Sequence, residues 1–185
     1  MSVETILVFG EGDEGTPTGL TLELLAAARG LATNVEVFVA GDGAAMAAEL
    51  GAHGASKVYT TGPLDGKLTG VHAAAALQNH METSSPDAVF FGQTPDGRDT
   101  AARLAVRIDQ PVVTNNVGAS VEDELWLLKN RSLGVRKTFS QLSETKVLRW
   151  LSFAQSPSKR KLLAAVRPRS QKSMQLTREQ LAQPL

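Results

Sequence analysis

Short apolar runs alternate with longer amphipathic segments along the first 115 residues of the chain. The runs are rich in β-branched and aromatic residues, which is typical of buried strands, while the longer segments repeat apolar residues at helical spacing. The predicted strands are residues 5–10, 35–41, 56–61, 87–92 and 111–115. The predicted helices are residues 20–32, 44–55, 65–82 and 97–108. This alternation predicts an α/β fold, a Rossmann-like parallel sheet with helices on both faces.

The pattern changes after Asn115, where several β-rich segments follow one another without a helix between them. These segments are residues 124–131, 135–143, 146–153 and 159–168. We expect them to form a C-terminal antiparallel extension, with Trp126 and Trp150 packed in the core. The domain is therefore predicted to span residues 1–170. Residues 171–185 form a polar tail that is expected to be mobile or to dock on a partner.

Composition narrows the function classes. A chain of 185 residues with 42% hydrophobic residues fits one domain with a real core. Lys+Arg and Asp+Glu both number 19, so neither nucleic acid nor anionic lipid is expected as a partner. No run approaches about 18 apolar residues, so we expect no membrane insertion. The chain has no cysteine, which excludes disulfides and thiolate chemistry and fits a cytoplasmic location.

The loop "GQTPDGRD" (92–99) follows the fourth predicted strand and opens the fourth predicted helix. In open α/β sheets, ligands bind beyond the carboxyl ends of the strands, where the strand order reverses. We expect such a switch point between the first and fourth strands. Its candidate cofactor-contact residues are Gly10, Glu11, Gly92, Gln93, Thr94, Gly97, Arg98 and Asp99.

Two interpretations of this loop stay open. In the first, Asp96 caps the helix, Asp99 meets the helix dipole, and Arg98 is a clamp that ties down loop carbonyls or Glu11. In the second, the switch point binds a small nucleotide such as AMP or ATP. The loop "GEGDEG" (10–15) argues against the second, because its three carboxylates would repel a phosphate.

No catalytic or metal-binding residues are predicted. The chain lacks a nucleophile elbow, a Walker loop and a G-x-G-x-x-G fingerprint. The three histidines, His53, His72 and His80, have no metal-ligand spacing. The basic residues near the C-terminus either protect an exposed edge strand or meet an acidic partner. They are Lys159, Arg160, Lys161, Arg167, Arg169 and Lys172.

The blocks "ILVFGEGDEG", "VEVFVAGDG" and "AVFFGQTPDGRDTAARLAVRI" resemble the N-terminal domain of the electron transfer flavoprotein alpha subunit. The matching positions are Gly97, Arg98, Asp99, Ala101, Arg103, Leu104, Ala105 and Arg107. The resemblance is strong over residues 3–117 and weaker over 118–169. Ala102 stands where the family often has proline, and "RSLGVRKTFSQLSE" replaces the family's arginine-aromatic-glycine-glycine strand.

The resemblance implies a fold of the adenine nucleotide alpha hydrolase-like kind and a role as a scaffold in flavin-mediated electron transfer. It implies FAD as the family cofactor, bound mainly by a C-terminal domain whose signatures this sequence lacks. We therefore expect no flavin on this chain alone. The implied partner is a beta-like subunit or a separate flavin domain, with self-association as another route to cover open strand edges. The alternative is a divergent nucleotide-binding module of the same fold.

Overall fold

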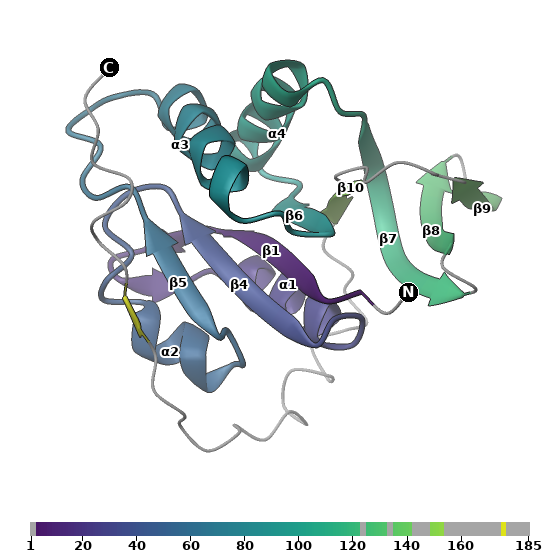
Figure 1. Cartoon of the computed structure of the whole chain (residues 1–185), viewed down its shortest axis with the longest axis horizontal. Coiled ribbons are helices and arrows are strands. Elements are labelled where there is room, and N and C mark those ends of the chain that lie inside the picture. Colours follow the sequence, from purple (N-terminus) through teal and green to yellow (C-terminus); the bar gives the residue numbers. More distant parts are fainter. Residues whose placement is uncertain (1–2, 123–124, 133–134, 142–148, 154–174, 177–185) are drawn as a thin grey trace.

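The computed structural model describes residues 3–122, 125–132, 135–141, 149–153 and 175–176 (Figure 1). Apart from a short hairpin directly after the first strand, strands and helices alternate up to Glu122, as the hydrophobic pattern predicts. The strands are β1 (Thr5–Gly10), β2 (Gly12–Asp13), β3 (Thr16–Pro17), β4 (Asn34–Val39), β5 (Lys57–Thr60), β6 (Ala88–Gly92), β7 (Val112–Glu122), β8 (Leu125–Ser132), β9 (Val135–Gln141), β10 (Arg149–Phe153) and β11 (Gln175–Leu176). The helices are α1 (Gly19–Arg29), α2 (Ala47–Ala52), α3 (Thr69–Thr83) and α4 (Pro95–Ile108).

The main sheet has the strand order β11-β5-β4-β1-β6-β10-β7-β8-β9 in the described part of the chain. Strands β4, β5 and β6 run parallel to β1 or to its neighbours. Because β1 pairs with β4 on one side and with β6 on the other, the strand order reverses at the β1–β6 boundary. The fourth strand predicted from the sequence is β6, so the predicted switch point between the first and fourth predicted strands is confirmed.

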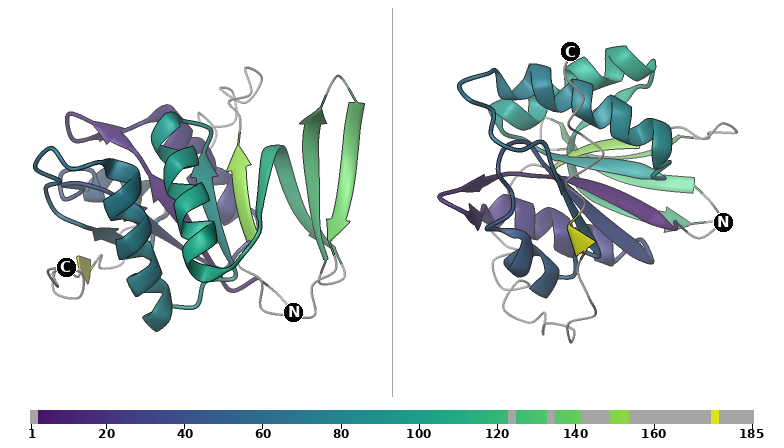
Figure 2. Two further views of the ribbon diagram at one scale, coloured as in Figure 1. Left: turned by 90° about the horizontal axis from the view of Figure 1, so that it is seen from above. Right: turned by 60° about the vertical axis from the view of Figure 1, so that its left-hand side comes forward.

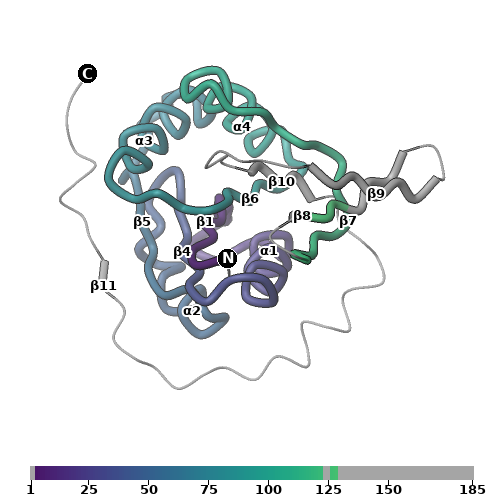
Figure 3. Tube along the Cα trace, turned by 45° about the vertical axis from the view of Figure 1, so that its right-hand side comes forward, coloured from purple at the N-terminus to yellow at the C-terminus, as the bar shows by residue number. Residues whose placement is uncertain are grey.

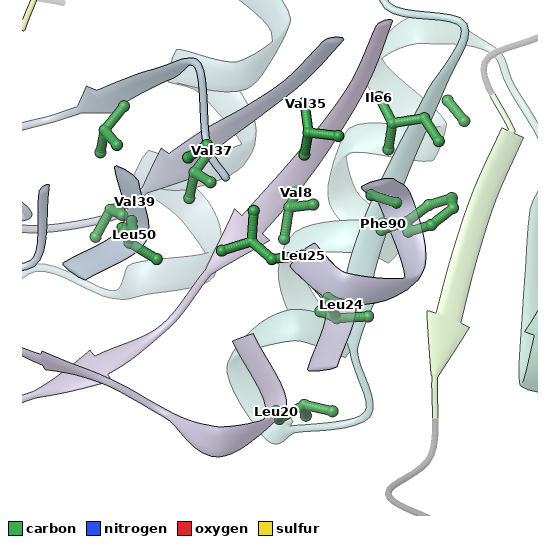
Figure 4. Packing of buried hydrophobic residues seen from close by; sticks show 14 of the residues in the cluster. Ile6, Val8, Leu20, Leu24, Leu25, Val35, Val37, Val39, Leu50 and Phe90 are labelled. Atoms are coloured by element: carbon green, nitrogen blue, oxygen red, sulfur yellow. The ribbon is translucent and has the colours of Figure 1, made fainter. Parts of the chain in front are cut away.

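The helices form one layer on each face of the sheet, as predicted. Figure 3 shows α3 and α4 on one side of the strands and α1 and α2 on the other. Alternate residues of β1 serve the two layers: Ile6 and Val8 pack with α1 and α2 (Figure 4), whereas Leu7 and Phe9 pack with α3 and α4. These four side chains are at most 1% exposed, so the strand is buried on both faces.

The C-terminal extension is antiparallel only in part. Strand β8 pairs antiparallel with β7, and β9 pairs antiparallel with β8, as predicted. Strand β10, which was expected to continue this meander, instead lies between β6 and β7 and runs parallel to both. In that position it joins the parallel core to the extension, which projects beyond the helices as the green strands of Figure 2. Composition alone could not reveal this, because pairing between distant strands has no local signal.

Trp126 lies in the core, as predicted: it is 5% exposed and meets the Phe90 ring edge-on, with 6.3 Å between centroids. The side chain of Trp150 is outside the described part, as are residues 159–168 and the basic residues near the C-terminus. Of the tail, the structure describes only β11, which pairs parallel with β5 at the edge of the sheet.

Candidate functional site

The switch point is built from the two loops that follow β1 and β6. The loop after β1 leads to α1 and the loop after β6 leads to α4, and these helices lie on opposite faces of the sheet. Both helices point their N-termini, the positive ends of their dipoles, toward this edge. The edge therefore has the general form of the sites where α/β folds bind anions.

The main chain of Glu11 is held at the start of α1. Its N–H donates to Thr21 Oγ1 at 2.8 Å, and the same hydroxyl donates to the Glu11 carbonyl at 2.8 Å. The Thr18 N–H also donates to this carbonyl, at 2.9 Å. Thr18 is the N-cap of α1, because its hydroxyl accepts from the Thr21 N–H. The backbone of Glu11 is therefore fixed by the first turn of α1.

The side chain of Glu11 reaches across the switch point to the start of α4. Thr94 Oγ1 donates to Glu11 Oε1 at 2.5 Å, and the same hydroxyl accepts from the Gly97 N–H at 2.9 Å. Thr94 is thus the N-cap of α4 and the partner of Glu11 at once. Glu11 consequently links the first turns of the two helices that flank the switch point.

The environment of Glu11 raises the pKa of its carboxyl group above the ordinary value of 4.5. Partial burial is the largest cause, and the negative charge of Asp96 adds to it. The hydrogen bond from Thr94 and an interaction with the Gly97 backbone lower the pKa without cancelling the rise. The ionised carboxylate is therefore held in place at a net energetic cost.

This raised pKa predicts a pH dependence of stability that Glu11→Gln removes. Because the folded state binds the Glu11 proton more tightly than the unfolded state, stability falls as the pH rises from about 4.5 through the folded-state pKa. The wild-type protein should lose stability relative to Glu11→Gln over that interval. Urea denaturation of both proteins from about pH 4 to about pH 8 measures this difference.

The matched control for this titration is Asp13→Asn, which removes an exposed carboxylate from the same loop without touching α4. It reports the effect of losing one charge near this edge. A difference between wild type and Glu11→Gln that is independent of pH, or that grows in favour of wild type as the pH rises, would contradict the assignment.

Gly97 allows the close approach of α4 to the end of β6. A Cβ atom at this position would lie 2.4 Å from the carbonyl oxygen of Gly92 and 3.2 Å from Glu11 Oε1. The glycine of the "GRD" block is therefore a packing requirement of the switch point. Gln93, between these glycines, donates to Asn115 Oδ1 of β7 at 2.9 Å and ties the loop to the neighbouring strand.

Arg98 and Asp99 do not form the expected clamp. The Arg98 side chain is exposed and makes no hydrogen bond or ion pair with another described residue. Asp99 pairs instead with Arg103, one turn further along α4, at 2.9 and 3.0 Å, and its carboxylate lies against Gly70 of α3. Both residues lie on a helix that starts at Pro95, two residues earlier than predicted, and neither is among the described hydrogen-bond partners of Glu11.

The cap of α4 was also misassigned, because Thr94 rather than Asp96 accepts from the helix N-terminus. The signal was present in the sequence: proline is favoured at the first helical position, with threonine or serine directly before it. Sequence reasoning also missed Thr18 and Thr21, since their contacts with Glu11 depend on how α1 packs. Of the eight candidate residues, the structure brings Glu11, Thr94 and Gly97 into one cluster.

The acidic loop after β1, for which the sequence predicted no strand, forms a small hairpin. Strands β2 and β3 pair antiparallel, and Glu14 and Gly15 between them both have positive φ angles, 47° and 79°. Two adjacent residues of this kind are typical of a tight hairpin turn. The hairpin places the carboxylates of Asp13 and Glu14 in solvent next to the switch point.

Other features of the described part provide no competing site at this edge. No group of three or more His, Cys, Asp or Glu side chains there is placed to hold a metal ion. A hollow of about 400 Å³ lies between the end of α1 and the start of β4, lined by Arg29, Thr33 and Gly54 among others, at the amino ends of the strands.

None of the helices described has the length and apolarity that crossing a membrane requires.

The fold and this edge together define a Rossmann-like α/β module with its own carboxylate at the switch point. Its sequence matches the family described as "Electron transfer flavoprotein domain" over residues 6–173. The chain therefore belongs to the electron transfer flavoprotein family and corresponds to an N-terminal alpha-subunit-like domain.

Curated relatives agree with this assignment. The chain is 30% identical over 122 residues to the electron transfer flavoprotein subunit alpha of Bacillus subtilis (strain 168), covering 63% of this chain and 37% of the relative. It is 35% identical over 115 residues to that of Mycobacterium tuberculosis (strain CDC 1551 / Oshkosh), covering 60% and 36%. For Syntrophomonas wolfei the identity is 32% over 119 residues, covering 62% and 37%. The chain thus spans a little over a third of the length of these relatives.

The family is associated with flavin, and in a fold of this kind a dinucleotide such as FAD would bind at the switch point. A dinucleotide needs free N–H groups at a helix N-terminus to bind its pyrophosphate. Here the first turn of α4 is already engaged by Thr94 and Glu11, and a pyrophosphate would meet the carboxylate. The residues at this edge do not fit FAD.

Proposed function

We propose that this chain is a scaffold in flavin-mediated electron transfer, an alpha-subunit-like module that contacts a beta-like subunit and holds no flavin itself. The observation that carries the proposal is the contact between Glu11 and Thr94 at the switch point. Because these side chains lie where other proteins of this fold bind a ligand, the module is suited to a scaffold role rather than to ligand binding. Flavin would then be bound elsewhere in the assembly. The lack of cysteine fits a cytoplasmic site of action.

The antiparallel extension is the surface that we assign to the partner. Strand β9 lies at the end of the strand order, so one of its edges has no strand beside it in the described part. Exposed edges pair readily with another chain. One face of β8 is covered, since Trp126 and Leu128 belong to the core cluster that includes α1. Leu127, between them, is half-buried and faces the opposite side, which leaves an apolar residue for a partner.

Leu127→Glu should weaken binding of a beta-like subunit by about tenfold or more, because it places a charge on the open face of the extension. The matched control is Val106→Glu, which changes an apolar residue that is 84% exposed on α4, away from the extension. Binding is measured by titrating a beta-like electron transfer flavoprotein subunit into each purified protein, and the oligomeric state of each chain alone by sedimentation.

Equal affinities of Leu127→Glu and wild type would contradict the assignment of the extension, as would a larger loss in Val106→Glu. If a separate flavin domain binds and a beta-like subunit does not, the proposed partner is wrong and the flavin domain takes its place. Stable self-association abolished by Leu127→Glu would assign the same face to a second copy of this chain.

The alternative function, binding of AMP or ATP at the switch point, has less support. The Glu11 carboxylate lies against Thr94, the N-cap of α4, and Asp13, Glu14 and Asp96 add negative charge at this edge. A nucleotide phosphate would approach this edge against all of these charges.

A further inference from the structure

We infer that strands β8 and β9 of the extension form a basic docking surface for a folded protein whose contacting surface is acidic. The inference rests on the proposed function and deepens it, because it names the chemistry of the partner surface that the extension would contact. We call β8 and β9 together the basic strand pair. The support comes from the distribution of charge along the chain and from the register of these two strands.

Positive and negative charge are divided between two parts of the chain. Residues 1–122, the acidic module, contain 15 Asp and Glu but only 6 Lys and Arg, a net charge of −9. Residues 123–185 contain 4 Asp and Glu and 13 Lys and Arg, a net charge of +9. The neutral total is therefore the sum of two strong and opposite charges, a pattern that indicates an interaction with a charged partner.

The basic strand pair carries part of this positive charge. It contains Lys129, Arg131, Arg136 and Lys137, and the sequence of neither strand includes Asp or Glu. In the register of the two strands, Arg131 stands directly opposite Arg136. Like charges at directly opposed positions destabilise a strand pair. The two strands therefore bring together positive charge that no acidic residue of their own neutralises.

Protection of an edge strand explains only part of this charge. Strand β9 is last in the strand order, and charged residues on such a strand hinder unwanted pairing. Strand β8, however, lies between β7 and β9, so Lys129 and Arg131 are not on an edge. Because positions in a strand alternate between its two faces, these residues occupy positions on the same open face as Leu127. The open face thus combines an apolar position with basic ones.

The acidic module favours a partner whose negative charge is local. A nucleic acid or an anionic membrane carries negative charge over a large area, and residues 1–122 would repel it. A folded protein can instead place a small acidic surface on the extension, which projects beyond the helices (Figure 2). An apolar position bordered by charged ones is also typical of a protein interface.

The experiment measures binding of a beta-like electron transfer flavoprotein subunit to wild type, Arg131→Glu and Lys67→Glu at several salt concentrations. Arg131→Glu reverses one charge of the basic strand pair and replaces the like-charge pair with an opposite-charge pair, so the chain should be at least as stable as wild type. Lys67→Glu is the matched control, because it makes the same charge change at an exposed position of the acidic module. Arg131→Gln serves as a second variant if Arg131→Glu does not fold.

We expect the affinity of wild type to fall about tenfold between about 0.05 M and about 0.5 M salt, because salt screens the attraction. At the lower concentration Arg131→Glu should bind about tenfold more weakly than wild type, with an equal or higher thermal midpoint and a smaller salt dependence. Lys67→Glu should stay within about twofold of wild type. A purely structural role of Arg131 would lower the thermal midpoint and leave the salt dependence unchanged.

Binding that is independent of salt, or equal losses in Arg131→Glu and Lys67→Glu, would overturn the inference while the proposed partner stands. Salt-sensitive self-association that Arg131→Glu abolishes would also overturn it, because the basic strand pair would then meet the acidic module of a second copy.

If the wild-type chain binds no beta-like subunit, the proposed function fails, and poly-L-glutamate and a DNA duplex of equal total charge then test the inference separately. Binding of poly-L-glutamate in preference to DNA, lost in Arg131→Glu but kept in Lys67→Glu, would support an acidic protein surface as the partner. Preference for DNA, or binding of neither polymer, would overturn the inference.

Discussion

Replacing Gly97 with alanine is expected to lower the free energy of unfolding by about 3 kcal/mol or more, which makes it one of the most damaging single changes at the switch point. The new methyl group would lie 2.4 Å from the carbonyl oxygen of Gly92 and 2.9 Å from Thr94 Oγ1. The first obstacle is backbone at the end of β6 and cannot rotate away. The first turn of α4 would have to move, and the contact between Thr94 and Glu11 would move with it.

Gly19→Ala is the matched control, since Gly19 is the first residue of α1 and a Cβ there would meet no atom within 4 Å. Its free energy of unfolding should stay within about 0.5 kcal/mol of wild type or rise slightly. Chemical denaturation of both variants measures the difference. Similar midpoints for Gly97→Ala and wild type would mean that α4 and β6 approach less closely than described.

Replacing Thr94 with valine is expected to cost about 2–3 kcal/mol of unfolding free energy, although the shape of the side chain is nearly kept. The hydroxyl has two roles that valine cannot fill. It accepts from the Gly97 N–H as the cap of α4, at 2.9 Å, and it donates to Glu11 at 2.5 Å. The change therefore removes the cap and leaves a half-buried carboxylate without its donor.

Thr94→Ser keeps the hydroxyl and should remain within about 1 kcal/mol of wild type. Combining Thr94→Val with Glu11→Ala separates the two roles, because in the double variant only the loss of the cap remains. Urea denaturation of wild type, Thr94→Val, Glu11→Ala and the double variant gives four free energies of unfolding. The coupling energy between the two side chains is calculated from them. Strict additivity of Thr94→Val and Glu11→Ala would show that the two side chains do not interact.

The hydrophobic pattern predicts the strands β1, β4, β5 and β6 and the helices α1–α4, because each of them has a local cause. Strand β1 was predicted at its observed bounds, and β6 began one residue later than expected. Both are buried on two faces, so their sequences are continuous apolar runs that stand out from their surroundings. The helices are buried on one side only, so each shows a single apolar face, and the errors in their bounds lie at the ends, where capping decides.

The strand order of the extension could not be obtained in this way. Strand β10 has the same β-rich composition as β8 and β9, yet it pairs with β6 and β7 in parallel. Its place is decided by the free edge of β6, a strand some 60 residues earlier in the chain. The end of strand β7 was also predicted wrongly: the strand extends to Glu122, whereas the sequence predicted an end at Asn115.

The α/β class, the family resemblance and the position of the switch point follow from the amino-acid sequence, because they depend on periodicity and on motifs that are local in the chain. The sequence also named Glu11, Thr94 and Gly97 as candidates, without their roles. The hydrogen bond between Glu11 and Thr94, which are 83 residues apart, and the exposure of Arg98 become visible only in the folded chain. The physical reason is that the packing of α4 on the sheet decides which side of the helix faces β1, and this packing is made by contacts between distant residues.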